Sequence, residues 1–252
     1  MTDPYTEIAL SRPNDVAIGG ALITMVEPDA GAEHEYNRWY EDDHFYSGAM
    51  QGPWMFAGRR WVATRALRSR RVTTGQPLFE PPDAGCYISL YWITKGQEPG
   101  NERWGYVAMD QGLMPFGRGF TRRRHVYTAF HRYRFGLVRD PGPMKPHLAL
   151  DAGYRGLLVE VDRGTTAAKR LGEKFRAYAT WSASCGQEKT FGIRAMRVVT
   201  LVPDERRLER LRLEVDLPRD LHDGDRFGLR VQGDSMIDAG ILSGDYIFVR
   251  KQ

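Results

Sequence analysis

The order of strand and helix patterns over residues 18–135 constrains the fold of this chain more than any other feature. Short apolar or alternating stretches, typical of β-strands, occur at 18–26, 59–65, 87–93 and 125–135. Apolar residues at helical spacing lie between the first two strands, at 32–46, and between the last two, at 101–116. A strand–helix–strand unit therefore occurs twice, which predicts an antiparallel sheet with both helices on one face.

This order is that of a ferredoxin-like α+β fold. The face away from the helices would carry Trp61, one of Tyr91 and Trp92, and alternate residues of 125–135. A large aromatic sheet face is normally covered by a second sheet. We therefore expect either a homodimer or a second copy of the same unit within the chain.

The second half of the chain repeats the pattern less clearly after the Pro-Gly-Pro turn at 141–143. A strand at 156–162, a helix at 166–181, a strand at 194–202 and a charged helix at 204–213 are predicted, followed by short strands at 227–231 and 246–250. We divide the chain into a ferredoxin-like domain at 1–142, a strand–helix–strand unit at 143–213 and a β-rich segment at 214–252. The middle unit is either a second repeat or a nuclease-like remnant.

Composition excludes several classes of protein. Hydrophobic residues make up 42% and charged residues 27% of the chain, which is typical of a globular protein and not of a disordered one. No apolar run approaches the ~20 residues of a membrane span, and the first residues do not resemble a signal peptide. The two cysteines, Cys86 and Cys185, form no CxxC pair and favour the cytoplasm.

The distribution of charge says more about partners than the net charge of +4. Residues 163–212 hold twelve basic and five acidic side chains, which makes this stretch the better candidate for contact with nucleic acid. The six arginines of 118–134 are more simply explained as a solvated edge of the sheet. No phosphate-binding glycine motif precedes a helix, so we expect no nucleotide cofactor, and no ligand set indicates a metal.

Residues 18–160 resemble the EthD-like group of dimeric α+β barrel proteins, through GALITMVEP at 20–28 and NRWYEDDHFY at 37–46. The resemblance implies two ferredoxin-like sheets packed into a barrel, with a pocket between sheet and helices. Members of this superfamily include cofactor-free monooxygenases and isomerases, so the resemblance does not fix a reaction.

In such a pocket His44 would be the proton-transfer group, because imidazole titrates near neutral pH, and Tyr40 would orient it. A small apolar molecule would be bound by an aromatic set that comprises Trp39, Trp54, Phe56, Trp61, Trp92 and, beside it, His125. Ordinary core packing explains many of the same aromatics equally well. His125 and His131 are expected to share one face of their strand.

Residues 143–212 resemble the replication-relaxation family of mobile-element proteins, through VEVDRGT at 159–165 and KRLGEKFRAYATW at 169–181. The resemblance implies a degenerate nuclease fold, whose activity needs clustered carboxylates around a divalent metal. Glu160 and Asp162 would face the same way on their strand, but His147 stands where the family's upstream aspartate is expected. We therefore predict that this part binds DNA, if at all, without cutting it.

Residues 215–252 resemble the LexA-type self-cleaving serine peptidases, and GDSM at 233–236 matches their nucleophile motif. Ser235 thus corresponds to the catalytic serine, which the family activates with a neutral lysine. Lys251 is the one lysine after Ser235 and does not match that general base. We treat the segment as a truncated peptidase and expect it to be inactive.

Three functions follow from these observations. The first is a small-molecule-binding α+β barrel protein, an enzyme only if the His44 site is catalytic. The second is a DNA-associated protein of mobile-element or SOS-response type without nuclease or peptidase activity. The third is a chimeric or artificial sequence with no evolved activity, because the three resemblances meet abruptly.

Overall fold

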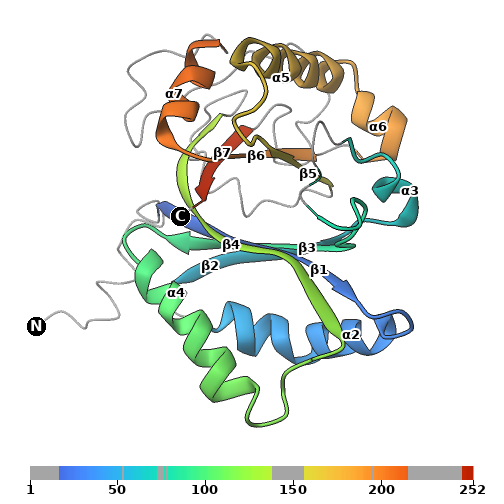
Figure 1. The fold of residues 1–252 in the computed structure, drawn as a ribbon, viewed down its shortest axis with the longest axis vertical. Coiled ribbons are helices and arrows are strands. Elements are labelled where there is room, and N and C mark those ends of the chain that lie inside the picture. The colour runs from blue at the N-terminus through green and yellow to red at the C-terminus, as the bar shows by residue number, and fades with distance from the viewer. Residues whose placement is uncertain are drawn as a thin grey trace, which may run out of the picture. The chain divides into compact units, whose positions relative to one another are not determined.

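The computed structural model describes residues 17–52, 54–72, 77, 79–137, 156–193, 196–214 and 246–251. They fall into two compact units, which we call the first unit (residues 19–132) and the second unit (residues 133–250). Both combine helices with a sheet, so the predicted α+β class is confirmed (Figure 1). Within the described residues, no helix has the length and apolar character needed to cross a membrane.

The four strands predicted for the first unit are all present. They are β1 (Ile18–Pro28), β2 (Met55–Val62), β3 (Tyr87–Thr94) and β4 (Arg123–Leu137). The strand order in this unit is β2-β3-β1-β4, with β1 antiparallel to β4 and β2 antiparallel to β3. The strands joined by the first helix, β1 and β2, are therefore not neighbours, since β3 lies between them.

The two long helices of the first unit, which begin with α2 (Glu33–Trp39) and α4 (Glu98–Val107), lie together on one face of this sheet (Figure 1). The predicted helix at 32–46 is the α-helix α2, which widens into a π-helix, η2 (Tyr40–Met50). The second helix likewise consists of α4 and the π-helical η3 (Ala108–Leu113). A short helix, α3 (Arg65–Arg68), follows β2. Long π-helical segments are rare and often occur at functional sites.

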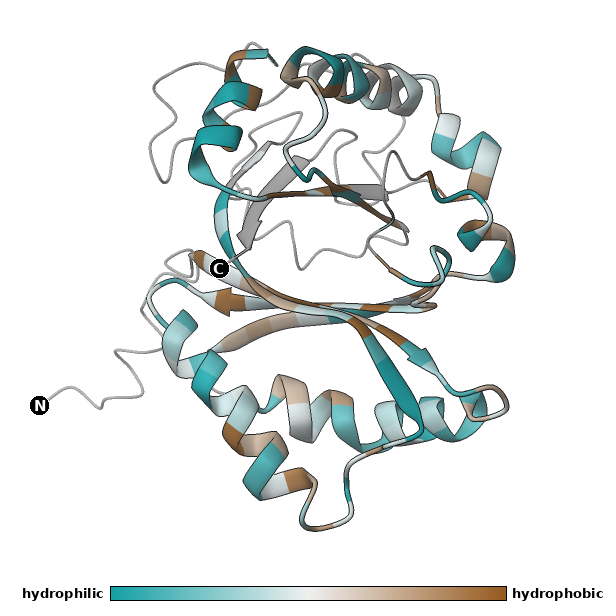
Figure 2. Cartoon of the chain, viewed as in Figure 1, coloured by the Kyte–Doolittle hydropathy of each residue, from teal (hydrophilic) through white to brown (hydrophobic). Residues whose placement is uncertain are grey.

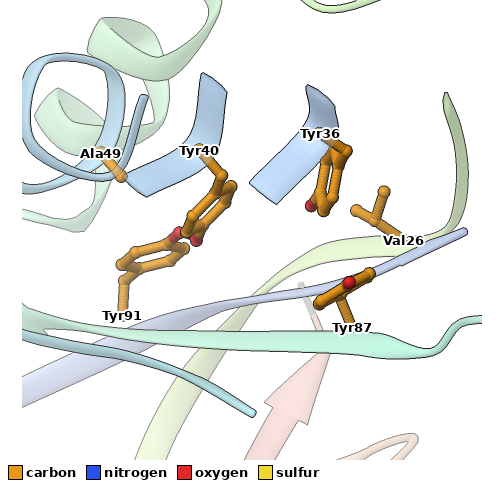
Figure 3. Close-up of a cluster of buried hydrophobic side chains, with 6 residues drawn as sticks. All are labelled: Val26, Tyr36, Tyr40, Ala49, Tyr87 and Tyr91. Carbon is orange, nitrogen blue, oxygen red and sulfur yellow. The ribbon is translucent and has the colours of Figure 1, made fainter. Parts of the chain in front are cut away.

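The two faces of β3 carry different side chains, because successive residues of a strand point to opposite sides. Tyr87, Ser89 and Tyr91 lie on the face toward the helices, where Tyr87 and Tyr91 pack with residues of α2 and η2 (Figure 3). Leu90 and Trp92 point to the other face and are also buried. Apolar colour accordingly runs along the strands of this unit in Figure 2.

The pairing of β1 with β4 corrects one prediction. Between Met25 and Val26 the register shifts, so that Val126 is an extra residue on β4. Such a β-bulge reverses the alternation beyond it. His125 pairs with Val26 and His131 pairs with Ala21, which is an odd number of residues away on β1. The two histidines therefore lie on opposite faces and not on the shared face that we predicted.

The strands of the second unit pair in a different way. Its strands β5 (Gly156–Val161), β6 (Met196–Val202) and β7 (Tyr246–Lys251) lie in the order β7-β6-β5 and are parallel. The prediction of antiparallel sheets is thus wrong for this unit, because helical crossovers join its neighbouring strands. Its strand order also differs from that of the first unit, in which strands joined by a helix are not adjacent.

The helices of the second unit are α5 (Ala168–Ala183), α6 (Gly186–Phe191) and α7 (Glu205–Glu214). Helices α5 and α7 pack against one another, and α7 contacts β6. Their buried side chains supply the core together with those of β6, namely Leu171, Phe175, Val199, Leu201, Leu208 and Leu211. The predicted strand at 227–231 lies outside the described residues.

Candidate functional site

Tyr40, the first residue of η2, lies in the core of the first unit with 4% of its surface exposed. Its hydroxyl is hydrogen-bonded to Ser89 Oγ at 2.8 Å and also contacts the hydroxyl of Tyr91. Figure 3 shows the hydroxyls of Tyr40 and Tyr91 pointing toward one another. Burial raises the pKa of both phenols, so both are neutral at pH 7.

Arg60 on β2 places its guanidinium among three tyrosine rings. Its Cζ lies 4.1 Å from the ring centre of Tyr40, 4.9 Å from that of Tyr87 and 5.8 Å from that of Tyr36. Distances below ~6 Å permit a cation–π attraction. Strand register explains the position, since Arg60 pairs with Ser89 and so shares the face of the β3 tyrosines.

Helix α2 and the start of η2 supply the polar partners of this arginine. Arg60 Nη2 donates to Glu41 Oε1 at 2.6 Å and to Asn37 Oδ1 at 3.0 Å. Asn37 Nδ2 in turn donates to the Tyr87 hydroxyl at 2.7 Å. The Tyr36 hydroxyl and Arg60 Nη1, by contrast, are buried and make no hydrogen bond of ordinary geometry among the described residues.

His44 lies one turn beyond Tyr40, and the two rings contact edge to face at 5.6 Å. Its imidazole stacks on Trp39, with ring centres 4.2 Å apart and planes inclined by 18°. The ring lies over Gly48, where a Cβ atom would approach His44 Nδ1 to 2.5 Å. His44 Nδ1 is buried and has no hydrogen-bond partner among the described residues.

The surroundings of His44 keep the imidazole neutral. Burial and, to a smaller extent, the nearby Arg123 lower its pKa from 6.5 to about 3, while Asp43 acts in the opposite sense. A group with so low a pKa is a weak general base at pH 7. The near-neutral titration that we expected for an isolated imidazole therefore does not describe this site.

Charged side chains border the histidine at the protein surface. Arg118 forms an ion pair with Asp43, and its Nη2 also donates to Ser47 Oγ at 2.6 Å. These bonds lower the pKa of Asp43 below its usual value of 3.8. Arg123 lies over the Trp39 ring at 4.2 Å. Arg118, Arg122 and Arg123 thus engage side chains of the first unit.

The aromatic residues that we predicted to line one pocket do not all lie together in the structure. Of these residues, Trp39 packs beside Tyr40 and His44. Trp61 and Trp92, by their strand pairing, lie on the opposite face of the sheet. Trp54, which is 43% exposed and has a φ of 72°, lies against Gly100 instead.

The remaining two candidates lie on strands. Phe56 occupies the irregularity between Met55 and Ala57 in the pairing of β2 with β3. His125 is exposed on β4, and its Nδ1 is hydrogen-bonded to Thr128 Oγ1 at 2.8 Å. The sequence interpretation missed Arg60, Tyr36 and Tyr87, although the alternation of residues 87–91 was the signal that could have found Tyr87.

The two carboxylates of β5 and the residue after it are already paired within the second unit. Glu160 Oε2 accepts from Lys174 Nζ at 2.5 Å and from the Tyr178 hydroxyl at 2.9 Å. Asp162 forms a buried, bidentate ion pair with Arg207, whose Nη2 also donates to the carbonyl oxygen of Thr166 at 2.6 Å. Among the described residues, no group of three or more His, Cys, Asp or Glu could hold a metal ion.

Helices α5 and α7 carry basic side chains that point to solvent. Lys169 and Arg170 on α5, and Arg206 and Arg210 on α7, are exposed and form no ion pair within the described residues. Arg206 and Arg210 are four residues apart and so lie on one side of α7. Figure 2 shows hydrophilic colour over much of α7 and parts of α5. Ser235 lies outside the described residues.

Comparison with known proteins identifies one segment of the chain. Residues 197–252 match the Peptidase S24-like family. A LexA repressor of Sorangium cellulosum is 56% identical over 54 residues, which are 21% of this chain and 22% of that protein. LexA repressors of Anaeromyxobacter dehalogenans (77% over 26 residues; 10% and 11%) and Oenococcus oeni (63% over 38 residues; 14% and 18%) are similar in the same way.

The chain thus spans about a fifth of the length of these relatives or less. The predicted LexA-like character of the C-terminal segment is confirmed by these matches. Within 197–252 the structure describes most of β6, α7 and β7. No solved structure matches the chain.

Proposed function

We propose that this chain is a DNA-associated protein of LexA-like or mobile-element type. The observation that carries the proposal is the similarity of residues 197–252 to Peptidase S24-like proteins and LexA repressors. Proteins so named are repressors, and the transfer of a DNA-related role to this chain is our inference. Helix α7 lies inside the matched segment and carries two of the exposed arginines.

Contact with the phosphate backbone is assigned to the second unit. Lys169, Arg170, Arg206 and Arg210 are exposed cations on two helices that pack together. Such unpaired surface cations release counterions when they meet phosphates, so binding weakens steeply as salt rises. The resemblance to the replication-relaxation family supports the same role for residues 143–212.

The proposal includes binding without cleavage of DNA. A nuclease of the implied type needs its carboxylates free to hold a divalent metal. Glu160 and Asp162 are instead neutralised by Lys174 and Arg207. These ion pairs support a role in which the second unit contacts DNA but does not hydrolyse it.

Fluorescence anisotropy with a labelled DNA duplex, repeated over a series of salt concentrations, tests the proposal. The slope of log K against log salt is negative, and each lost phosphate contact reduces its magnitude by about 0.9. The variant Arg206→Glu/Arg210→Glu should therefore weaken binding and reduce the slope by about 2. The control Arg65→Glu/Arg103→Glu makes the same change of charge on the first unit. Equal weakening by both variants, or no binding at low salt, contradicts the proposal.

We further propose that Ser235 does not cleave this chain, because Lys251 does not match the general base of the family. Incubation from neutral to alkaline pH, followed by mass spectrometry, should leave the chain intact. The variant Ser235→Ala should behave identically. A fragment formed by the wild type and not by this variant would overturn the proposal.

A second candidate function is binding of a small apolar molecule by the first unit. The observation that favours it is the buried and unpartnered His44 Nδ1 beside Tyr40 and Trp39. The order β2-β3-β1-β4 with helices on one face supports a ferredoxin-like unit of the EthD-like, dimeric α+β barrel type. A homodimer is part of this candidate.

In this candidate the neutral His44 accepts a hydrogen bond from the ligand and Tyr40, whose ring contacts the imidazole, orients it, as in a cofactor-free oxygenase or isomerase. A ligand hydroxyl that donates to Nδ1 would satisfy the buried atom. Calorimetric titration with indole, a small aromatic probe, tests the site. Saturable binding that His44→Ala weakens and His34→Ala preserves supports this function, and an absence of saturable heat removes its support.

A further inference from the structure

The three tyrosines around Arg60 have the geometry of a receptor for a cation. We call Tyr36, Tyr40 and Tyr87 the tyrosine cage. Their rings surround a guanidinium at 4.1 to 5.8 Å, and the Arg60 side chain is only 9% exposed. Aromatic faces attract cations most strongly where water is excluded. Burial also raises the pKa of Tyr36 and Tyr40, so these rings act as neutral π faces.

We propose that the tyrosine cage binds a small organic cation, a quaternary ammonium or an alkylguanidinium, and that Arg60 is a built-in plug which this ligand displaces. The inference is independent of the proposed association with DNA. It does not need an empty cavity, because the ligand takes the volume that the guanidinium vacates. The proposed site lies wholly within the first unit.

The resident arginine fits the cage incompletely. The Tyr36 hydroxyl and the Arg60 guanidinium interact, but Arg60 Nη1 and this hydroxyl are both buried without a hydrogen bond of ordinary geometry. A buried polar group without a partner is unfavourable relative to its hydrated state. Withdrawal of Arg60 toward water therefore recovers hydration for its guanidinium, which offsets part of the cation–π attraction that is lost.

A path for this withdrawal is present at the surface. Glu41, which accepts from Arg60 Nη2 at 2.6 Å, has a side chain that is 67% exposed. Arg60 can keep this ion pair while its guanidinium moves outward, since Glu41 already reaches into solvent. Asn37 Oδ1 is then released from Arg60 and offers an acceptor to the N–H groups of an alkylguanidinium.

The chemistry of the cage selects the class of ligand. Three electron-rich ring faces and the Asn37 Oδ1 acceptor favour a positive charge. An anion would meet the same ring faces and the Glu41 carboxylate, which repel it, while Arg123 near Tyr36 and Tyr40 acts in the opposite sense. A quaternary ammonium ion needs no hydrogen bond, so it suits a site whose walls are rings.

Titration with tetramethylammonium chloride, followed by tryptophan fluorescence at constant ionic strength, tests the proposal. Trp39 reports on the site because its ring lies 5.8 Å from that of Tyr36. We expect saturable binding to the wild type and about tenfold tighter binding to Arg60→Ala, because the plug no longer competes. Arg60→Lys keeps a cation but loses the forked guanidinium contacts, so it should bind with intermediate affinity.

Two controls make the result specific. Arg59→Ala alters the neighbouring arginine of β2, which by strand alternation points to the other face, and should bind as the wild type does. tert-Butanol has the shape of tetramethylammonium without its charge and should not bind. The proposal is overturned if the wild type and the folded variants Arg60→Ala and Arg60→Lys all show no saturable response to tetramethylammonium. It is also overturned if tert-butanol binds as tightly as tetramethylammonium does. Either result leaves the DNA-binding test unaffected.

Discussion

Acid should destabilise the first unit through His44, and the size of the effect follows from its environment. The imidazole is held neutral, with its pKa lowered from 6.5 to about 3 by burial and by Arg123. In the unfolded chain the same side chain binds a proton below pH 6.5. The unfolded state therefore binds more protons between these two values, and stability falls as pH falls through this window.

The magnitude is about 1.4 kcal/mol for each pH unit of the window. Between pH 6.5 and about 4.5, His44 alone should lower the free energy of unfolding by roughly 2–2.5 kcal/mol. This is roughly a seventh to a half of the 5–15 kcal/mol that stabilises a typical domain, so the effect is measurable. Asp43, whose pKa is lowered, adds its own loss only at more acidic pH.

Urea unfolding at a series of pH values, followed by tryptophan fluorescence, measures the effect. The signal comes mainly from the first unit, which holds every tryptophan except Trp181. The variant His44→Phe keeps a ring on Trp39 but cannot bind a proton, so its stability should fall less steeply below pH 6.5. His34→Gln, on the exposed side of α2, is the matched control and should follow the wild type. Parallel pH profiles for the wild type and His44→Phe would refute the reasoning.

Three further substitutions have predicted effects on stability, and urea unfolding measures each of them. Arg207→Met leaves Asp162 buried without its cation, so the second unit should lose about 3–5 kcal/mol; a loss within error would contradict a stabilising ion pair. Tyr40→Phe removes the hydroxyl that partners both Ser89 and Tyr91 in the core and should cost the first unit about 1–3 kcal/mol. Gly48→Ala places a Cβ atom 2.5 Å from His44 Nδ1 and should displace the ring at a cost of about 1–3 kcal/mol; unchanged stability and near-ultraviolet circular dichroism would count against the stacked geometry.

Local sequence patterns predicted most strands and helices, but they missed α3 and α6 and began β2 four residues late. Short apolar stretches predicted β1 and β3 nearly to the residue, because a run of this length and composition is typical of a buried strand. The strand predicted at 246–250 is present as β7. The LexA-like character of the C-terminal segment was equally visible, since a motif depends on residue identity and not on packing.

Pairing and faces depended on the tertiary structure. The bulge at Val126 reversed the predicted face of His131, because one extra residue inverts the alternation beyond it. The parallel sheet of the second unit arose from how its crossovers pack, which strand patterns do not encode.

The candidate site shows the same division. The sequence alone determined that Tyr40 and His44 occupy one side of a helix, because their spacing of four residues fixes this locally. Only the tertiary structure decided that His44 stacks on Trp39 with a lowered pKa, and that Arg60 enters the tyrosine cage. Burial and long-range pairing set these properties, since Arg60 and Tyr87 meet through strand register and not through their separation along the chain.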